Sequence, residues 1–181
     1  MNGRSKPKPD YVKTMDAQTW ASASLIERAV HVARSQERLK VREITENWGG
    51  MVTVYLRVAG LVSPAYWCAA FIYWCLLEAG ADKKKLWSNP ASTYFMWLWA
   101  HKNGRLVTNR VIGRSVGVYN KALGGHTWFF LNDTGDTIEG NTNVVGSRNG
   151  IGVFERNRSL AKMQAYPRYG CIRITDDLYA N

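Results

Sequence analysis

The chain has few cysteines and no long apolar run, and both shortages exclude whole classes of protein. Its three cysteines, Cys68, Cys75 and Cys171, cannot all pair in a monomer, which argues against a small scaffold held by disulfides. The richest apolar stretch, residues 69–81, contains Glu78 and is shorter than the ~18 residues that a membrane helix needs. We therefore expect no transmembrane segment. No apolar segment follows the opening residues either, so we expect no secretory signal peptide.

Acidic residues are scarce as well. The 181 residues include 14 Asp plus Glu against 24 Lys plus Arg, a formal net charge of +10. Hydrophobic residues nevertheless make up 46% and charged residues 21%, which excludes a mainly disordered chain. The basic residues gather within residues 4–13, 83–85, 102–114 and 148–168. Such patches attract polyanions, whether nucleic acid, anionic membrane or cell-wall polymer, or they serve only to keep a folded protein soluble.

The order of patterns along the chain predicts one α+β domain. Residues 1–15, with two Lys-Pro pairs, predict a flexible basic arm, and residues 16–181 a single folded domain. Ser24 and Glu27 have the spacing of a capping box. We expect helices at residues 21–37, 51–59, 67–79 and 91–102, then strands at 106–112, 116–119, 127–131, 137–139, 151–155 and 170–175. Helices followed by strands predict helices packed on an antiparallel sheet.

Cys68 is the strongest candidate nucleophile, because it begins the apolar third helix. The positive end of a helix dipole favours the thiolate form of a thiol in the first turn, although a buried structural cysteine fits the same position. His126 follows two glycines at the start of a strand and could act as the base. The turn at residues 132–136 pairs that strand with the strand carrying Glu139 and Asn141, so either residue could orient the imidazole.

Three of these motifs together resemble a known family. The runs YWCAAF at residues 66–71, GH at residues 125–126 and IEGNT at residues 138–142 are similar to the signature of the CHAP family, the cysteine- and histidine-dependent amidohydrolases and peptidases. The resemblance implies a papain-like, NlpC-type fold with the nucleophile at a helix N-terminus packed on an antiparallel sheet. It implies these site residues: Cys68 as nucleophile, His126 as general base and acid, Glu139 as orienting acid, Asn141 as a further polar group, and Tyr66, Trp67 and Trp128 beside the substrate.

The same resemblance implies a function. CHAP enzymes cleave amide bonds of bacterial peptidoglycan, between N-acetylmuramic acid and L-Ala or within the stem peptide and cross-bridge, through a thioester acyl-enzyme. Peptidoglycan rather than nucleic acid is then the expected partner, together with an immunity or inhibitor protein. Without a signal peptide, such a hydrolase is made in the cytoplasm and reaches the wall after lysis, as a phage endolysin does, or by dedicated export as an antibacterial effector.

Other interpretations of the same residues stay open. The basic, aromatic-rich composition also suits a binding module for nucleic acid or an anionic wall polymer without catalysis. A cysteine protease acting on another amide is a further alternative. We predict no cofactor and no metal, because His31 and His101 have no metal-spaced partner and no compact acidic loop suits calcium. Trp87, Trp97 and Trp99 either pack in the core or line a substrate groove.

Overall fold

Helices cover one antiparallel sheet in the computed structural model, which describes residues 16–108, 115–121, 124–143 and 150–180. The helices are α1 (Ala17–Ser22), α2 (Leu25–Arg38), α3 (Gly50–Val58), α4 (Cys68–Glu78), α5 (Thr93–Lys102) and α6 (Leu160–Gln164), with short turns η2 (Lys83–Lys85) and η3 (Asp176–Leu178). The strands are β1 (Leu106–Val107), β2 (Val116–Lys121), β3 (Gly124–Phe130), β4 (Asp136–Thr142), β5 (Gly152–Asn157) and β6 (Gly170–Ile172).

All neighbouring strands pair antiparallel, in the order β1-β6-β2-β3-β4-β5. The α+β class with an antiparallel sheet is therefore confirmed, as are the hairpin joining β3 to β4 and the four main helices to within a few residues. The arm predicted at residues 1–15 and residues 109–112 of the predicted first strand lie outside the described residues. No helix in the described part of the chain is long and apolar enough to cross a membrane.

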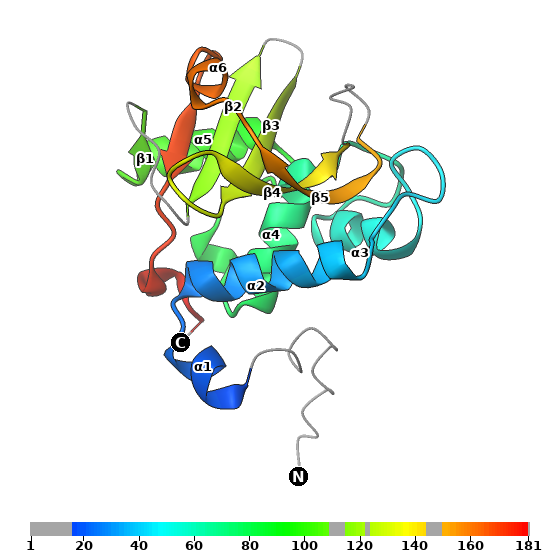
Figure 1. Cartoon of the computed structure of the whole chain (residues 1–181), viewed down its shortest axis with the longest axis horizontal. Coiled ribbons are helices and arrows are strands. Elements are labelled where there is room, and N and C mark those ends of the chain that lie inside the picture. Colours follow the sequence, from blue (N-terminus) through cyan, green and yellow to red (C-terminus); the bar gives the residue numbers. More distant parts are fainter. Residues whose placement is uncertain (1–15, 109–114, 122–123, 144–149, 181) are drawn as a thin grey trace.

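The first predicted helix, residues 21–37, was wrong at its start. The backbone of Ala23 and Ser24 is extended, and this break separates α1 from α2. The capping box explains the break, because the Ser24 N–H donates to Glu27 Oε2 (3.0 Å) and fixes Ser24 as the residue before the helix. Helix α2 then runs along one side of the molecule, with α6 at the opposite end and the sheet between them (Figure 1).

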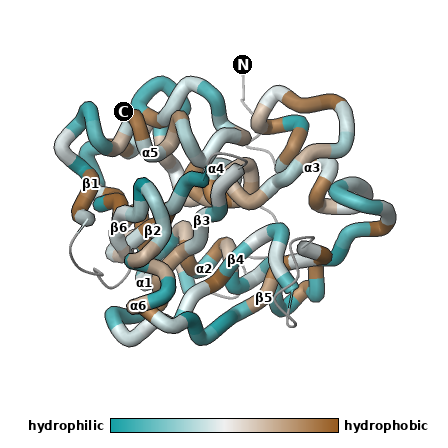
Figure 2. The backbone as a smooth tube through the Cα atoms, turned by 90° about the horizontal axis from the view of Figure 1, so that it is seen from above, coloured by the Kyte–Doolittle hydropathy of each residue, from teal (hydrophilic) through white to brown (hydrophobic). Residues whose placement is uncertain are grey.

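Helix α4 is the centre of the core. Nine of its eleven residues are buried, and it lies between α5 and α3 when seen from above (Figure 2). Gly140 of β4 permits this close packing, because a Cβ there would lie 2.7 Å from side-chain atoms of both Trp67 and Phe71. The absence of a side chain at Gly140 therefore brings the N-terminal turn of α4, which begins with Cys68, against β4.

The two faces of the sheet carry different clusters, as the alternation of side chains along strands requires. Phe129 and Ile138 join the main core with α4. Trp128 and Phe130, on either side of Phe129, point to the opposite face. They belong to a smaller cluster with Met163 of α6, Tyr169 and Cys171. The sequence patterns did not predict α6. Of the three tryptophans whose role was open, Trp87 is buried and Trp97 and Trp99 pack against the main core.

Candidate active site

Cys68 is the first residue of α4 and is 5% exposed. Trp67, the residue before the helix, makes no side-chain cap to the first N–H groups of α4. Uncapped N–H groups and the positive end of the helix dipole both favour negative charge at this position. The thiol and the helix N-terminus therefore form a site suited to a thiolate and to a developing oxyanion.

His126 lies on β3, and its imidazole is held by Glu139 of β4. His126 Nε2 lies 2.9 Å from Glu139 Oε2, and the Glu139 side chain is fully buried. The backbone pairing of β3 with β4 covers Phe129↔Ile138 and Phe130↔Thr137. Glu139 and His126 then lie on the same face of the two strands as diagonal neighbours, which long side chains can bridge. With Nε2 engaged, Nδ1 is the nitrogen left for the sulfur.

Glu139 has more hydrogen-bond partners than His126 alone. Its Oε1 accepts a bond from Thr137 Oγ1 (2.6 Å), and Arg158 donates to both carboxylate oxygens through Nε and Nη2. Burial alone would disfavour the charged carboxylate, but the hydrogen bonds and charges of Arg158 and His126 hold the pKa of Glu139 well below its usual range. Glu139 is therefore an anion at neutral pH.

The ionisation of His126 follows from these neighbours. Burial disfavours the imidazolium, yet the hydrogen bonds and charges of Cys68 and Glu139 outweigh burial and raise the pKa of His126 to about 9. Cys68 and Glu139 thus act in the same direction on the pKa of His126. At neutral pH the structure thus favours an imidazolium between a thiol and a carboxylate.

Asn141 occupies a different place from Glu139. Its backbone is left-handed (φ 54°), the pairing of β4 with β5 is irregular between Glu139 and Thr142, and its Nδ2 donates to Asn47 Oδ1 (3.3 Å). Of the two candidates for orienting His126, Glu139 makes the contact, because the turn in the backbone at Asn141 directs that side chain to the loop before α3. Asn141 Oδ1 is buried and has no hydrogen-bond partner among the residues that the structure describes.

That loop supports Trp67, the residue before Cys68. The Asn47 N–H donates to Glu43 Oε2 (2.8 Å), and Trp67 Nε1 donates to Glu43 Oε1 (2.7 Å). Asn141 therefore connects through Asn47 and Glu43 to the turn that presents Cys68.

Two of the three residues expected beside the substrate lie inside the core. Trp67 and Trp128 are fully buried, and their role as substrate contacts stays a prediction. Trp67 packs on Phe71, and the Trp128 ring lies 6.0 Å from the His126 ring, beneath Arg158. Both large apolar rings are more favourable in the core than at an open site. Tyr66 is 53% exposed and remains a prediction as a substrate contact.

Arg158 is the functional residue that sequence reasoning missed. It lies just after β5 within a basic stretch, and no spacing or motif distinguishes it from Arg156, two residues earlier. Only the folded sheet, in which β5 pairs with β4, brings it to Glu139. Charge complementarity to a buried acid on a neighbouring strand is the one signal that could have found it.

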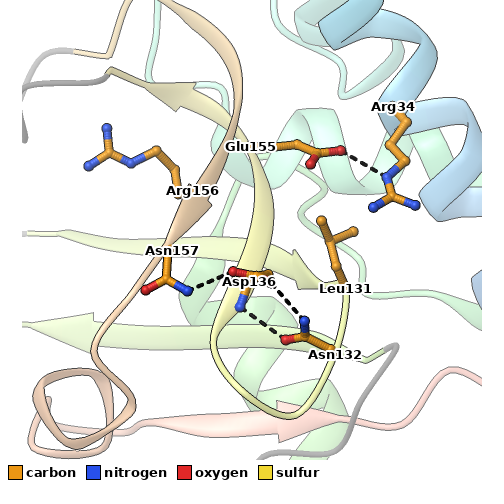
Figure 3. Close-up of a pocket in the computed structure, with 7 residues that line it drawn as sticks. All are labelled: Arg34, Leu131, Asn132, Asp136, Glu155, Arg156 and Asn157. Carbon is orange, nitrogen blue, oxygen red and sulfur yellow. Dashed lines mark hydrogen bonds and ion pairs between the residues drawn. The ribbon is translucent and has the colours of Figure 1, made fainter.

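A separate hollow of about 400 Å³ lies by the turn between β3 and β4 (Figure 3). Its polar groups already bind one another: Asn132 and Asn157 donate to Asp136, at 2.8 and 2.6 Å, and Arg34 pairs with Glu155 at 2.8 Å. Its lining excludes Cys68, His126 and Glu139, so the hollow is not part of the candidate site. The described residues contain no cluster of three His, Cys, Asp or Glu side chains that could hold a metal ion.

The chain matches no protein-family model, and comparisons with curated proteins and with solved structures find no match either.

Proposed function

We propose that the protein is a cysteine hydrolase of papain-like fold that cleaves an amide bond of bacterial peptidoglycan. The observation that carries the proposal is the arrangement of three side chains. Cys68 begins α4 without a side-chain cap, Cys68 helps to raise the pKa of His126 on β3, and buried Glu139 lies 2.9 Å from His126 Nε2. A nucleophile, a base and a group orienting the base are the three parts that acyl transfer by cysteine needs.

Each residue has one role in the proposed reaction. The Cys68 thiolate attacks the amide carbonyl carbon, a C–S bond forms, and the oxygen becomes an oxyanion near the free N–H groups of α4. The His126 imidazolium then protonates the nitrogen as the C–N bond breaks, which releases an amine and leaves a thioester. Water, deprotonated by His126, hydrolyses the thioester to a carboxylic acid and restores the thiol.

The substrate class is supported by the sequence motifs and by charge. The motifs around Cys68, His126 and Glu139 resemble those of CHAP peptidoglycan hydrolases. The net charge of +10 favours encounter with an anionic cell wall. The cut is assigned to the bond between N-acetylmuramic acid and L-Ala or to a bond of the stem peptide or cross-bridge.

Purified sacculi provide the test. Wild-type protein should release soluble peptides or muropeptides, and Cys68→Ala should release none. Cys75→Ala is the matched control, because Cys75 lies in the same helix, is fully buried, and should keep wild-type activity. Equal activity of wild type and Cys68→Ala would refute thiol catalysis. Mass spectrometry of the products identifies the bond that is cut.

Alkylation distinguishes the enzyme from a binding module. Iodoacetamide at neutral pH should modify Cys68 before Cys75 and Cys171, and the rate should fall in His126→Ala. A module that only binds a polyanion predicts no selective alkylation, no hydrolysis, and salt-sensitive binding.

A further inference from the structure

Aromatic rings and exposed cations gather on one side of His126. The group, called here the Tyr119 surface, consists of Tyr94, Tyr119, Lys121, Tyr166 and Arg168. Tyr119 stands opposite His126 in the pairing of β2 with β3, with ring centroids 6.4 Å apart, and the Tyr119 and Tyr166 rings stack at 4.1 Å. The surface therefore borders the candidate site directly.

Three separate segments are fixed together to form this surface. Buried Asn120 of β2 accepts a hydrogen bond from Thr93 Oγ1 (2.7 Å) at the start of α5, and its N–H donates to the Pro167 carbonyl (3.2 Å). Arg168 has a left-handed backbone (φ 49°), which residues other than glycine seldom adopt. These contacts hold the cations of the surface near His126 in a defined arrangement.

Both cations are exposed and have an aromatic rather than an acidic neighbour. Lys121 Nζ lies 4.2 Å from the Tyr166 ring centroid and 5.4 Å from that of Tyr119, and the Arg168 guanidinium lies 5.5 Å from the Tyr94 centroid. The ion pairs found among the described residues use other cations. Each charged group therefore retains hydrogen-bonding capacity for an anion from outside.

The facing sides of the Tyr119 and Tyr166 rings are closed to nucleobases. Tyr119 and Tyr166 cover each other, and Lys121 lies close to both. Base stacking needs a free ring face, which this arrangement does not offer between the two tyrosines. A small anion held by the cation heads fits the surface better.

We propose that the Tyr119 surface binds a carboxylate of the peptide on the leaving-amine side of the cleaved bond. The inference rests on the proposed function, in which His126 protonates the departing nitrogen. The segment that leaves with the new amino group must then start at His126, and the adjoining Tyr119 surface is where it continues. The enzyme should accordingly favour stem peptides with free carboxylates over amidated ones.

The test compares synthetic stem peptides on the full-length Cys68→Ala protein. The probes are L-Ala-γ-D-Glu-L-Lys-D-Ala-D-Ala as the free acid and two forms amidated at either the D-Glu α-carboxylate or the C-terminus. We expect one amidated form to bind about tenfold more weakly, which also identifies the carboxylate that is recognised. In the double variant Lys121→Met/Arg168→Met, binding of the free-acid peptide should weaken by a similar factor. The preference for the free acid over the amidated peptides should disappear.

Lys84→Met is the matched control, because it removes one exposed lysine in η2. This turn contacts the C-terminal half of α5, where Trp99 Nε1 donates to the Lys85 carbonyl. It should leave the preference unchanged. If the double variant still prefers free-acid peptides, the inference is overturned. It is also overturned if the double variant loses only binding to a phosphate-rich wall polymer. Failure of the proposed function would give a different result, because wild-type protein would then leave sacculi intact. The peptide comparison would still test whether the Tyr119 surface binds a carboxylate.

Discussion

Replacing Arg158 with Gln tests the electrostatic reasoning about the site. Glu139 is fully buried and accepts four hydrogen bonds, two of them from Arg158 and one each from His126 and Thr137. Arg158→Gln removes the cationic partner of Glu139 and leaves its buried carboxylate without the charge that offsets burial. Breaking such a pair costs about 3–5 kcal/mol, and because the Arg158 side chain is 28% exposed we take about 3 kcal/mol.

The loss should depend on pH in a defined direction. The folded-state pKa of Glu139 is depressed, so its contribution to stability is present above its unfolded pKa and is lost as pH falls through the folded value. Arg158→Gln raises the folded pKa toward the ordinary range. The difference in free energy of unfolding between wild type and variant should thus be largest near neutral pH. It should shrink as pH falls below about 4.

Urea unfolding followed by tryptophan fluorescence across this pH range measures the difference. Arg34→Gln is the control, because its ion pair with Glu155 is 45% and 46% exposed and should be worth about 1 kcal/mol or less. If Arg158→Gln costs no more than Arg34→Gln, or if its cost does not change with pH, the account of a buried carboxylate held by Arg158 is wrong.

Three further predictions concern the reaction and the packing. Glu139→Gln should lower kcat on muropeptides about a hundredfold, and Asn141→Ala should lower it less, because only Glu139 contacts the imidazole; equal losses would contradict this. Hydrolysis should fall as pH rises through about 9, where His126 loses the proton needed by the leaving amine, and a pH-rate profile checks it. Gly140→Ala should cost about 1–3 kcal/mol of stability and slow alkylation of the thiol, because the new methyl group displaces Phe71; wild-type values of both would refute the role of this contact.

Local patterns predicted the parts of the fold that local physics determines. Apolar residues at helical spacing predicted α2, although the prediction began at residue 21 and the Ser24 capping box starts the helix at Leu25. Turn residues 132–136 gave the hairpin, which is why Glu139 was expected near His126. The choice between Glu139 and Asn141 was beyond the sequence, because it depends on the irregular pairing of β4 with β5.

Contacts between distant segments were the part that could not be predicted. Arg158 follows Glu139 by nineteen positions and reaches it across the pairing of β4 with β5. Trp67 and Trp128 lie within or near the motifs of Cys68 and His126, and the resemblance implied that they meet the substrate. The folded chain buries both, because α4 and α6 cover opposite faces of the sheet. Adjacency in sequence to a reactive residue does not determine exposure.

Charge balance at the site separates the structural role of Glu139 from its catalytic role. Near neutral pH, His126 and Arg158 carry two positive charges around one carboxylate. Glu139→Gln leaves the Arg158 guanidinium partly buried without its anion, whereas Glu139→Gln/Arg158→Gln removes both charges of the pair. The double variant should therefore regain stability relative to Glu139→Gln, as replacement of whole buried ion pairs often permits.

Activity should not return with that stability. In both variants the carboxylate that holds the His126 ring and favours its imidazolium is missing, so kcat should stay as low in the double variant as in Glu139→Gln. Unfolding in urea and single-turnover hydrolysis, measured on the same preparations, give the two quantities independently. Recovery of both together would mean that Glu139 serves the fold alone, and that some other group orients His126.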